Sequence, residues 1–424
     1  MNCDVLVIGA GVMGLSSAYH LKRLNPGKRV VLIERLGGPG QGSTAKSGGG
    51  FRNLLTSGTN RLLSEATIDW LNHLQWETEH DIGLHNTSYL YLLGESQHNR
   101  QKPLFKEMGE AGVELKTYSP EELKGLIPDL VTDFTGDEDA EMMGLEPIEV
   151  GVQGIRCGTV NTDALARCWE ALFLGLGGVV QYNTSADRLI LGAERELGLP
   201  GEPFVWQGPV VKGAETSRGE ITAETTVVAA GVWSETLLDP IGFDSMTRPK
   251  KRCMFVFNDP RLERLLHAKG FNDEGILPFT QLPDAGVYIK ADVSEGSIWV
   301  GVTEDLGRGY GLEDDPQPEL ETYTDNAYHA LVKYLPCFEG VRPVNMWAGQ
   351  RAVNRFDKIP VVEGMPGLIY VGGATGNGIM KCDSLGRIVA AHYAGEEEAE
   401  LYGGRRVRVS DISVKDRRVE KERF

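Results

Sequence analysis

The chain has 424 residues, a length that suggests two or three domains and leaves room for large hydrophobic cores. Lys and Arg number 43 against 60 Asp and Glu, so the formal net charge is −17, which argues against nucleic acid or an anionic membrane surface as the main partner. Apolar residues make up 41% and charged residues 24%, a balance that excludes chain-wide disorder. Glycine, with 53 residues, is in excess and predicts many tight turns or close backbone approaches.

The cysteines, histidines and apolar runs bear on location and on metal binding. The six cysteines are scattered without C-x-x-C spacing, and the eight histidines lack metal-ligand spacing. We therefore expect no metal site and a reduced, cytoplasmic protein. The sequence has no run of 18 or more apolar residues, so no transmembrane segment is expected. No signal peptide is expected either, because no basic region precedes the first apolar run and no cleavage site follows it.

The first residues in the chain have the pattern of a dinucleotide-binding unit. A short β-branched run leads into Gly9-Ala-Gly11-Val-Met-Gly14, and a helical pattern and a second apolar run ending at Glu34 follow. In such a unit the first glycine permits a tight turn, the second lets a pyrophosphate approach the backbone, and the third lets helix and strand pack closely. The helix N-terminus offers N–H groups to phosphate, and Glu34 can hold the ribose hydroxyls.

A glycine-rich loop after Glu34 favours FAD over a nicotinamide cofactor. A nicotinamide enzyme usually continues into another helix and strand, whereas residues 35–52 here are rich in glycine and small hydroxyl side chains. Such a loop can run along an extended cofactor and donate backbone N–H groups to it, and we prefer this role to that of a mobile linker. The residues of the loop assigned to FAD are Arg35, Ser43, Thr44, Lys46 and Ser47.

Later segments repeat the change from strand to glycine-rich turn. Residues 225–234 and 367–379 each place an apolar run before a turn of small residues, and a helix is expected over 383–394. Helices and strands that alternate near both ends predict a parallel sheet assembled from separated segments. Residues 191–220 are expected to form an extended hairpin or loop, and residues 405–424 a surface extension.

Further motifs follow the N-terminal fingerprint in order: Gly158-Thr-Val-Asn-Thr-Asp163-Ala-Leu165, Val227-Val-Ala-Ala-Gly231-Val-Trp-Ser234, Trp347-Ala-Gly-Gln-Arg351, Asp357-Lys-Ile-Pro360 and Gly373-Ala-Thr-Gly-Asn-Gly378. Together they span nearly the whole chain and resemble the FAD-dependent amino-acid and amine oxidoreductases of the D-amino-acid oxidase superfamily. The glycine oxidase, sarcosine oxidase and dye-linked L-proline dehydrogenase branch is the most similar.

The resemblance implies an α/β (α+β) fold of two domains. One is an FAD-binding Rossmann-like domain built from discontinuous segments, residues 1–85, 150–240 and 345–424. The other is a substrate-binding domain with an antiparallel sheet, residues 86–149 and 241–344.

The resemblance also adds residues to the expected FAD site and implies how FAD is held. Relatives link their flavin through a Cys in the segment that reads Gly349-Gln350-Arg351 here, or through a His at the position of Lys46. Because neither linking residue is present, FAD is expected to be bound non-covalently. The added FAD-contacting residues are Ala186, Ala230, Gly231, Trp233, Gly349, Gly376, Asn377, Gly378, Ile379, Met380 and Lys381.

Three side chains are expected to take part in catalysis. FAD carries the redox chemistry, so the protein has to fix the substrate and aim its carbon at flavin N5. Arg351 matches the carboxylate-binding arginine of the family, Tyr288 a tyrosine that reaches the same carboxylate, and Arg52 an arginine over the flavin ring. A surface arginine and a half-buried strand tyrosine are the alternatives for Arg351 and Tyr288. Lys46 and Lys381 are either cations near the cofactor or solvated lysines.

The expected activity is FAD-dependent oxidation of a small amino acid or secondary amine by hydride transfer to flavin N5. L-proline is the leading substrate, with sarcosine and glycine next. Trp299 stands where sarcosine oxidases have an oxygen-activating lysine, which favours a dehydrogenase, and the electron acceptor (oxygen, a quinone or a dye-type molecule) stays open. A 2-hydroxy-acid or glycerol-phosphate dehydrogenase and a non-catalytic flavoprotein subunit are the alternatives.

Overall fold

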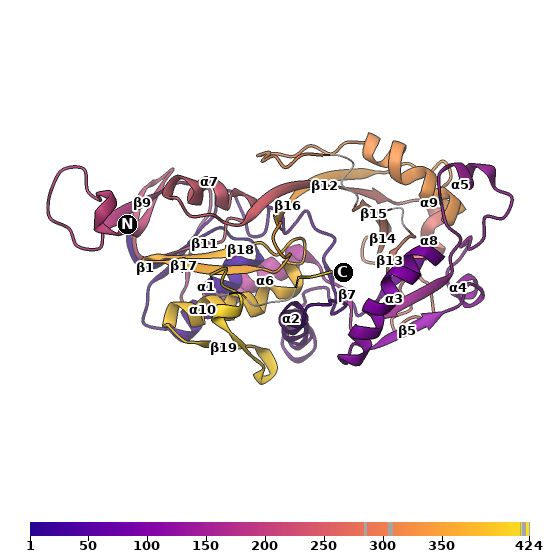
Figure 1. The fold of residues 1–424 in the computed structure, drawn as a ribbon, viewed down its shortest axis with the longest axis horizontal. Helices are drawn as coiled ribbons and strands as arrows, with labels where there is room; N and C mark the ends of the chain where they lie inside the picture. Colours follow the sequence, from indigo (N-terminus) through magenta and orange to yellow (C-terminus); the bar gives the residue numbers. More distant parts are fainter. Residues whose placement is uncertain (284–285, 304–307, 416, 418–420, 424) are drawn as a thin grey trace.

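Two eight-stranded sheets organise the chain, whose computed structural model describes residues 1–283, 286–303, 308–415, 417 and 421–423. Figure 1 shows the first sheet with its helices toward one end of an elongated molecule and the second sheet toward the other. This α/β arrangement agrees with the fold class expected from the sequence.

The first sheet has the order β17-β18-β11-β1-β2-β8, and β10 and β9 extend it from β11. Its strands are β1 (Asn2–Ile8), β2 (Val30–Ile33), β8 (Val179–Gln181), β9 (Ala186–Ala193), β10 (Pro209–Thr216), β11 (Gly219–Val228), β17 (Val361–Met365) and β18 (Leu368–Gly372). From β18 to β8 the neighbours are parallel, so strands that lie far apart in the sequence become adjacent. The antiparallel pair β9–β10 confirms the extended hairpin expected within residues 191–220.

Helices cover the first sheet and bury its strands. The helices are α1 (Val12–Leu24), α2 (Gly58–Glu77), α6 (Thr162–Gly175), α7 (Ser234–Leu238) and α10 (Cys382–Ala394). The α1 helix packs against both α10 and α6, and the side chains of Val5, Val7 and Leu32 are fully buried beneath them. The continuous apolar runs of β1 and β2 follow from this burial, because parallel strands inside a sheet are covered on both faces.

The second sheet has the order β16-β12-β15-β14-β13-β4-β6-β5 and is antiparallel except for the pair β13–β4. Its strands are β4 (Tyr89–Leu93), β5 (Leu115–Tyr118), β6 (Val150–Gly154), β12 (Thr247–Phe257), β13 (Phe279–Gln281), β14 (Val287–Asp292), β15 (Ser297–Val302) and β16 (Asn345–Asn354). Around this sheet lie α3 (Glu95–Glu110), α4 (Pro120–Leu126), α5 (Glu138–Met142), α8 (Glu263–Leu266) and α9 (Tyr328–Tyr334).

Two predicted segment boundaries differ from the sheets that the chain forms. Residues 150–154 and 345–354 were assigned to the FAD-binding domain, but β6 and β16 are strands of the second sheet. The ten residues of β16 pair with β12 from Asn345↔Val256 to Asn354↔Thr247. A motif beside a cofactor does not reveal which sheet supplies the backbone hydrogen bonds of its strand.

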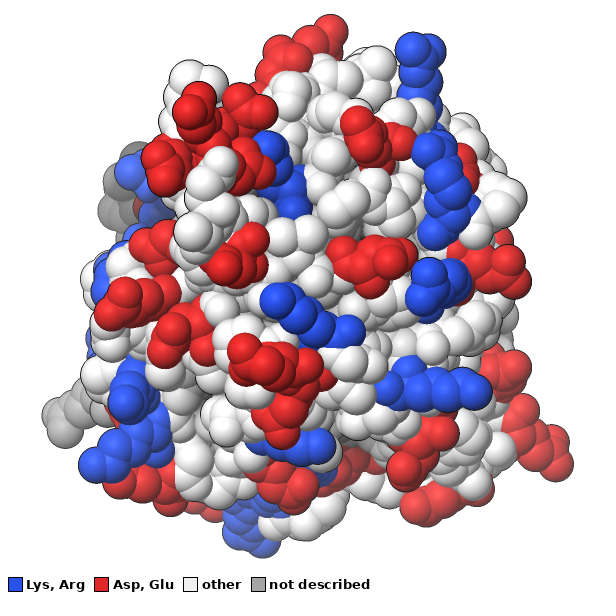
Figure 2. Space-filling model, turned by 90° about the vertical axis from the view of Figure 1, so that its right-hand side faces the viewer, with Lys and Arg blue, Asp and Glu red and all other residues white. Residues whose placement is uncertain are grey.

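The expectation of a surface extension for residues 405–424 was wrong for several of them. The short strand β20 (Arg406–Arg408) pairs with β19 (Glu398–Glu400), but Val407, Val409, Ile412 and Glu422 are buried, as is the side chain of Arg417. Among the described residues no helix is long and apolar enough to cross a membrane. Figure 2 shows acidic and basic side chains interspersed on the end of the molecule that carries the second sheet.

Candidate active site

A cavity of about 1000 Å³ is lined by residues from both sheets. Most residues assigned from the sequence lie in its wall, and Gly14 and Lys381 lie outside it. The assigned residues in the wall are Gly9, Gly11, Glu34, Arg35, Ser43, Thr44, Lys46, Ser47, Arg52, Ala186, Ala230, Gly231, Trp233, Tyr288, Gly349, Arg351, Gly376, Asn377, Gly378, Ile379 and Met380.

The three glycines of the N-terminal fingerprint have different surroundings. Gly9 has φ +105°, and a Cβ there would lie 2.7 Å from the carbonyl oxygen of Ala229. A Cβ on Gly14 would lie 1.9 Å from the carbonyl oxygen of Gly9, so this glycine allows α1 to pack on β1 and has no need to face the cavity. Gly11 is the N-cap of α1, and the nearest atom to a Cβ there is Thr44 Oγ1 at 3.5 Å. The space beside Gly11 is therefore open to a ligand, as the approach of a pyrophosphate requires.

Backbone N–H groups hold the Glu34 carboxylate at the end of β2. Ala10 N donates to Oε2 at 2.7 Å and Leu36 N donates to Oε1 at 2.9 Å. Each carboxylate oxygen can accept a further hydrogen bond, so the oriented group can still receive two hydroxyls from the cavity. The Thr44 hydroxyl accepts from Val12 N at 3.3 Å and ties the glycine-rich loop to the start of α1.

A cluster of Arg35, Trp233 and Asp314 lies at the same end of the cavity as Glu34. The Arg35 guanidinium lies 3.9 Å from the centroid of the Trp233 ring, a cation–π contact. Trp233 Nε1 donates to Asp314 Oδ1 at 3.1 Å, and Arg35 Nη1 lies 3.5 Å from the same oxygen. This contact links the first sheet to the 308–319 segment, which follows the second sheet's β15 in sequence.

Arg351 and Tyr288 face the cavity from the second sheet. The Arg351 side chain lies against Gly376, where a Cβ would be 3.2 Å from Arg351 Cδ. Burial lowers the pKa of Arg351 and raises that of Tyr288, and each group opposes the shift of the other. Arginine keeps its charge in proteins, and a phenol with a raised pKa is neutral at neutral pH, so both side chains can donate hydrogen bonds to an anion.

Arg52 follows β3 (Gly50–Phe51) and turns toward two tyrosines on β4. Its Nη1 donates to Leu54 O at 2.7 Å and to the Tyr91 hydroxyl at 3.1 Å. The Tyr89 ring stacks on Phe279 with centroids 4.5 Å apart, and Phe279 stacks on Tyr288 at 4.9 Å. An aromatic wall therefore joins Arg52, predicted to lie over the flavin ring, to Tyr288, a predicted substrate contact.

Comparison with known proteins identifies the family. A family model described as FAD dependent oxidoreductase matches residues 4–392. The chain belongs to this family of FAD-dependent oxidoreductases. The match confirms the superfamily, the enzymatic class and the cofactor expected from the sequence motifs.

Individual relatives of this FAD-dependent oxidoreductase are distant but extend over most of the chain. FAD-dependent oxidoreductase domain-containing protein 1 of Xenopus laevis is 23% identical over 425 residues, covering 92% of this chain and 78% of the relative. Glycine oxidase of Pseudomonas aeruginosa is 26% identical over 412 residues, covering 94% and 96%. The solved structure of L-proline dehydrogenase from P. horikoshii has a TM-score of 0.73 at 20% identity, covering 93% of this chain and 94% of that one, and shows that the fold is shared.

Several cavity residues of this FAD-dependent oxidoreductase were not assigned from the sequence. Lys250 and Arg252 lie on β12 opposite Arg351 and Gly349 on β16, so their side chains share one face of the sheet. Lys250, Lys251 and Arg252 form a continuous basic run, so the sequence offered no alternation that separates the two faces of the strand, and the partner strand was unknown. Tyr89, Tyr91, Tyr310, Asp314 and Glu422 also line the cavity.

Lys381, assigned to FAD from the resemblance, is fully buried outside the cavity lining. It ends the short η7 helix (Ile379–Lys381), and its Nζ donates to Asn60 Oδ1 at 2.7 Å. Ile379 and Met380, which precede it, do line the cavity. The tight turn of η7 sends successive side chains in different directions, so Lys381 points toward α2 instead.

Proposed function

We propose that this FAD-dependent oxidoreductase oxidises a small amino acid or secondary amine, with L-proline the leading substrate and sarcosine and glycine next. The observation that carries the proposal is the pair Arg351 and Tyr288 on one wall of the FAD cavity. A guanidinium offers two parallel N–H donors that fit a carboxylate, and the tyrosine hydroxyl supplies a third donor. Glycine oxidase and L-proline dehydrogenase among the similar proteins support an amino-acid substrate.

The walls around this pair favour a small, largely apolar body beside the carboxylate. Met254, Phe279 and Tyr288 form a hydrophobic cluster, with Tyr89, Trp299 and Trp347 packed against it. A short aliphatic chain or a five-membered ring loses contact with water there, while its carboxylate is bound by Arg351. The binding energy fixes the position of the substrate carbon and so contributes to catalysis through orientation.

The residues between Gly9 and Thr44, which we call the cradle, are proposed to hold FAD, which supplies a two-electron acceptor when bound. The open space beside Gly11 and the N-terminus of α1 suit the pyrophosphate, and the oriented Glu34 carboxylate suits the ribose. Binding is proposed to be non-covalent, because Lys46 and Gln350 stand at the linking positions. Cys253 also borders the cavity, but its side chain packs in the core of the second sheet. Acid precipitation should release the flavin into the supernatant, and flavin retained by the pellet would contradict this.

The acceptor is proposed to be a quinone or a dye-type molecule, so that the enzyme is a dehydrogenase. Trp299 packs edge-to-face on Trp347 with centroids 5.0 Å apart, and the Lys290 ammonium lies 3.9 Å from the Trp299 ring centroid. Lys290 is paired with Asp292 at 3.2 Å and does not line the cavity.

A cytoplasmic location is also proposed, because the six cysteines are all unpaired and five are buried.

Anaerobic mixing with a substrate panel tests the proposed reaction. L-proline, sarcosine or glycine should bleach the flavin absorbance, and turnover with a quinone or dye should exceed turnover with oxygen. A 2-hydroxy acid or glycerol phosphate as the sole reductant would establish the alternative chemistry on the same fold. A flavin that no member of the panel reduces would contradict an enzymatic role toward these substrates.

A further inference from the structure

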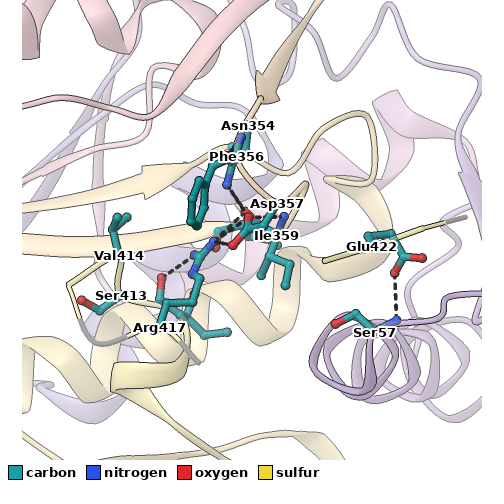
Figure 3. A network of polar contacts seen from close by, with 12 residues as sticks. Ser57, Asn354, Phe356, Asp357, Ile359, Ser413, Val414, Arg417 and Glu422 are labelled. Carbon is teal, nitrogen blue, oxygen red and sulfur yellow. Dashed lines mark hydrogen bonds and ion pairs between the residues drawn. The ribbon is translucent and has the colours of Figure 1, made fainter. Parts of the chain in front are cut away.

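Arg417 anchors the tail that follows α10, and Glu422, further along the tail, lines the FAD cavity. Arg417 Nη1 lies 2.8 and 2.6 Å from the two carboxylate oxygens of Asp357, and Nη2 donates to Ile412 O at 2.9 Å and to Pro360 O. The paired side chains of Arg417 and Asp357 are only 3% and 6% exposed. Asp357 also accepts from Asn354 Nδ2 at 2.8 Å, so the anchor reaches the end of β16 (Figure 3).

Beyond this anchor the tail inserts the Glu422 side chain beside the first turn of α2. Glu422 is 1% exposed and borders the cavity. Its Oε1 accepts from Thr56 N at 3.0 Å and from Thr56 Oγ1 at 2.7 Å, and its Oε2 accepts from Ser57 N at 3.2 Å and Asn60 Nδ2 at 3.3 Å. Figure 3 shows Glu422 reaching the start of the helix. A negative charge is stabilised at this place by the N–H groups and the dipole of α2.

The Glu422 charge acts on two cations from different elements: Arg52, which lines the cavity as Glu422 does, and Lys381. Asn60 on α2 connects Glu422 to Lys381, since its amide donates to the carboxylate and accepts from the ammonium at 2.7 Å. Burial lowers the pKa of Lys381 to about 7, the Arg52 charge lowers it as well, and the Glu422 carboxylate opposes both. Burial also lowers the pKa of Arg52, whereas the neighbouring tyrosines and Glu422 raise it, and the net shift is upward.

We propose that Glu422 is a positioning residue of the FAD site. It holds Arg52 and the first turn of α2 in the positions required for binding the flavin and the substrate. Its carboxylate compensates the charge of Arg52, which lines the cavity, and of Lys381, which lies behind it. Removing that charge leaves the buried guanidinium of Arg52 without its compensating carboxylate, and Arg52 moves toward solvent or another acceptor. Lys381 loses its proton more readily, because Glu422 no longer raises its pKa. The substrate-dependent part of this inference rests on the proposed function.

Glu422→Gln tests the inference, with Arg423→Gln as the matched control on the next residue. The Arg423 side chain pairs with Glu107 at 2.6 Å on the surface, where both side chains are about half exposed. In the purified holoenzyme, Glu422→Gln should make the midpoint potential of the flavin more positive, because a negative charge near the reduced flavin is gone. It should also raise KM for the amino acid about ten-fold through the displaced Arg52. Arg423→Gln should change neither quantity.

A second pair of variants separates charge from simple support of the fold. Glu422→Asp keeps the charge on a shorter arm, so it should preserve the potential and raise KM, even if Glu422→Gln holds FAD poorly. Lys381→Met should increase the effect of Glu422→Gln on the potential, because Lys381 can then no longer offset the lost carboxylate by releasing its proton. Unchanged potential and KM in Glu422→Gln, with only a lower Tm, would overturn the proposal. The potential is measured without substrate, so it stays informative if the proposed reaction is wrong.

Discussion

The two ends of the FAD cavity are built in different ways. The cradle between Gly9 and Thr44 uses backbone groups, glycines without side chains and the single carboxylate of Glu34, and its residues lie close together in the sequence. The substrate end uses side chains from the end of β3, from β4, β12, β14 and β16, and from the tail. A change in the cradle should therefore act on FAD binding, whereas a change at the substrate end should act on the substrate.

The largest expected effect is at Gly11. Gly11→Val should abolish FAD binding, because the side chain would occupy the space that the pyrophosphate needs. The apoprotein should keep its Tm, since a Cβ at Gly11 meets only Thr44 Oγ1 at 3.5 Å. Flavin absorbance per chain and thermal unfolding of the apoprotein measure the two quantities.

Gly14→Val is the contrasting variant for the same measurement. Its Cβ would lie 1.9 Å from the Gly9 carbonyl oxygen, so the apoprotein itself should lose stability. A Gly11→Val protein that kept one flavin per chain would show that the cradle is not the pyrophosphate site.

At the substrate end, Arg351→Ala should lower kcat/KM for the amino acid. The loss should correspond to about 2–5 kcal/mol of transition-state stabilisation, because a buried carboxylate loses its charged partner. Arg351→Lys keeps the charge but not the two parallel donors, and should mainly raise KM. FAD content should stay near that of the parent protein. Steady-state kinetics with L-proline measures these effects.

The control for Arg351 is pyrrolidine, which has the ring and amine of proline but no carboxylate. Its oxidation should lose little in Arg351→Ala. Equal losses for pyrrolidine and proline would assign Arg351 a role other than carboxylate binding.

A smaller effect is expected at Glu34. Glu34→Ala should raise the dissociation constant for FAD roughly ten- to a hundred-fold, because a charge-assisted pair contributes about 1.5–3 kcal/mol. The spectrum of the bound flavin should not change. Glu34→Gln keeps an oxygen that can accept from Ala10 N or Leu36 N, so it should lose less. Equilibrium titration of the apoprotein gives the dissociation constants, and equal values for all three proteins would limit Glu34 to ending a strand.

The smallest effect is expected at Arg35. Its cation–π contact with Trp233 is worth about 0.5–1 kcal/mol, so Arg35→Ala should speed FAD dissociation only about two- to five-fold. Stopped-flow release of FAD, followed by its fluorescence, measures the rate. A change beyond a hundred-fold would show that Arg35 contributes more to FAD binding than its contact with Trp233.

The difference between the two ends also decides what the sequence revealed. The cradle could be predicted, because the turn of Gly9, the opening at Gly11 and the acid at Glu34 follow from local spacing. Predicting the substrate end requires the register between β12 and β16, which aligns Arg252 with Gly349. That register is determined by hydrogen bonding across the sheet. Arg351 and Tyr288 were found only through family motifs.

Two further features had no local signal. The direction of the Lys381 side chain depends on the turn of η7, and a motif position alone could not separate it from Met380. Glu422 lies in a mixed-charge tail. Its burial depends on the N–H groups at the start of α2, which have no hydrogen-bond partner within the helix. Such donors are recognised only when the helix start and the tail are placed in three dimensions.

The Glu422 contacts also have a consequence for the order of assembly. Glu422 meets Thr56 across 366 residues of sequence, and β1 meets β11 across about 219. Closing loops of this length is entropically costly and gains nothing until both partners are in place, so local hairpins such as β14–β15 should precede them. The cavity wall near Arg52 is then among the last parts to form. During refolding, the recovery of tight FAD binding should lag behind the recovery of secondary structure.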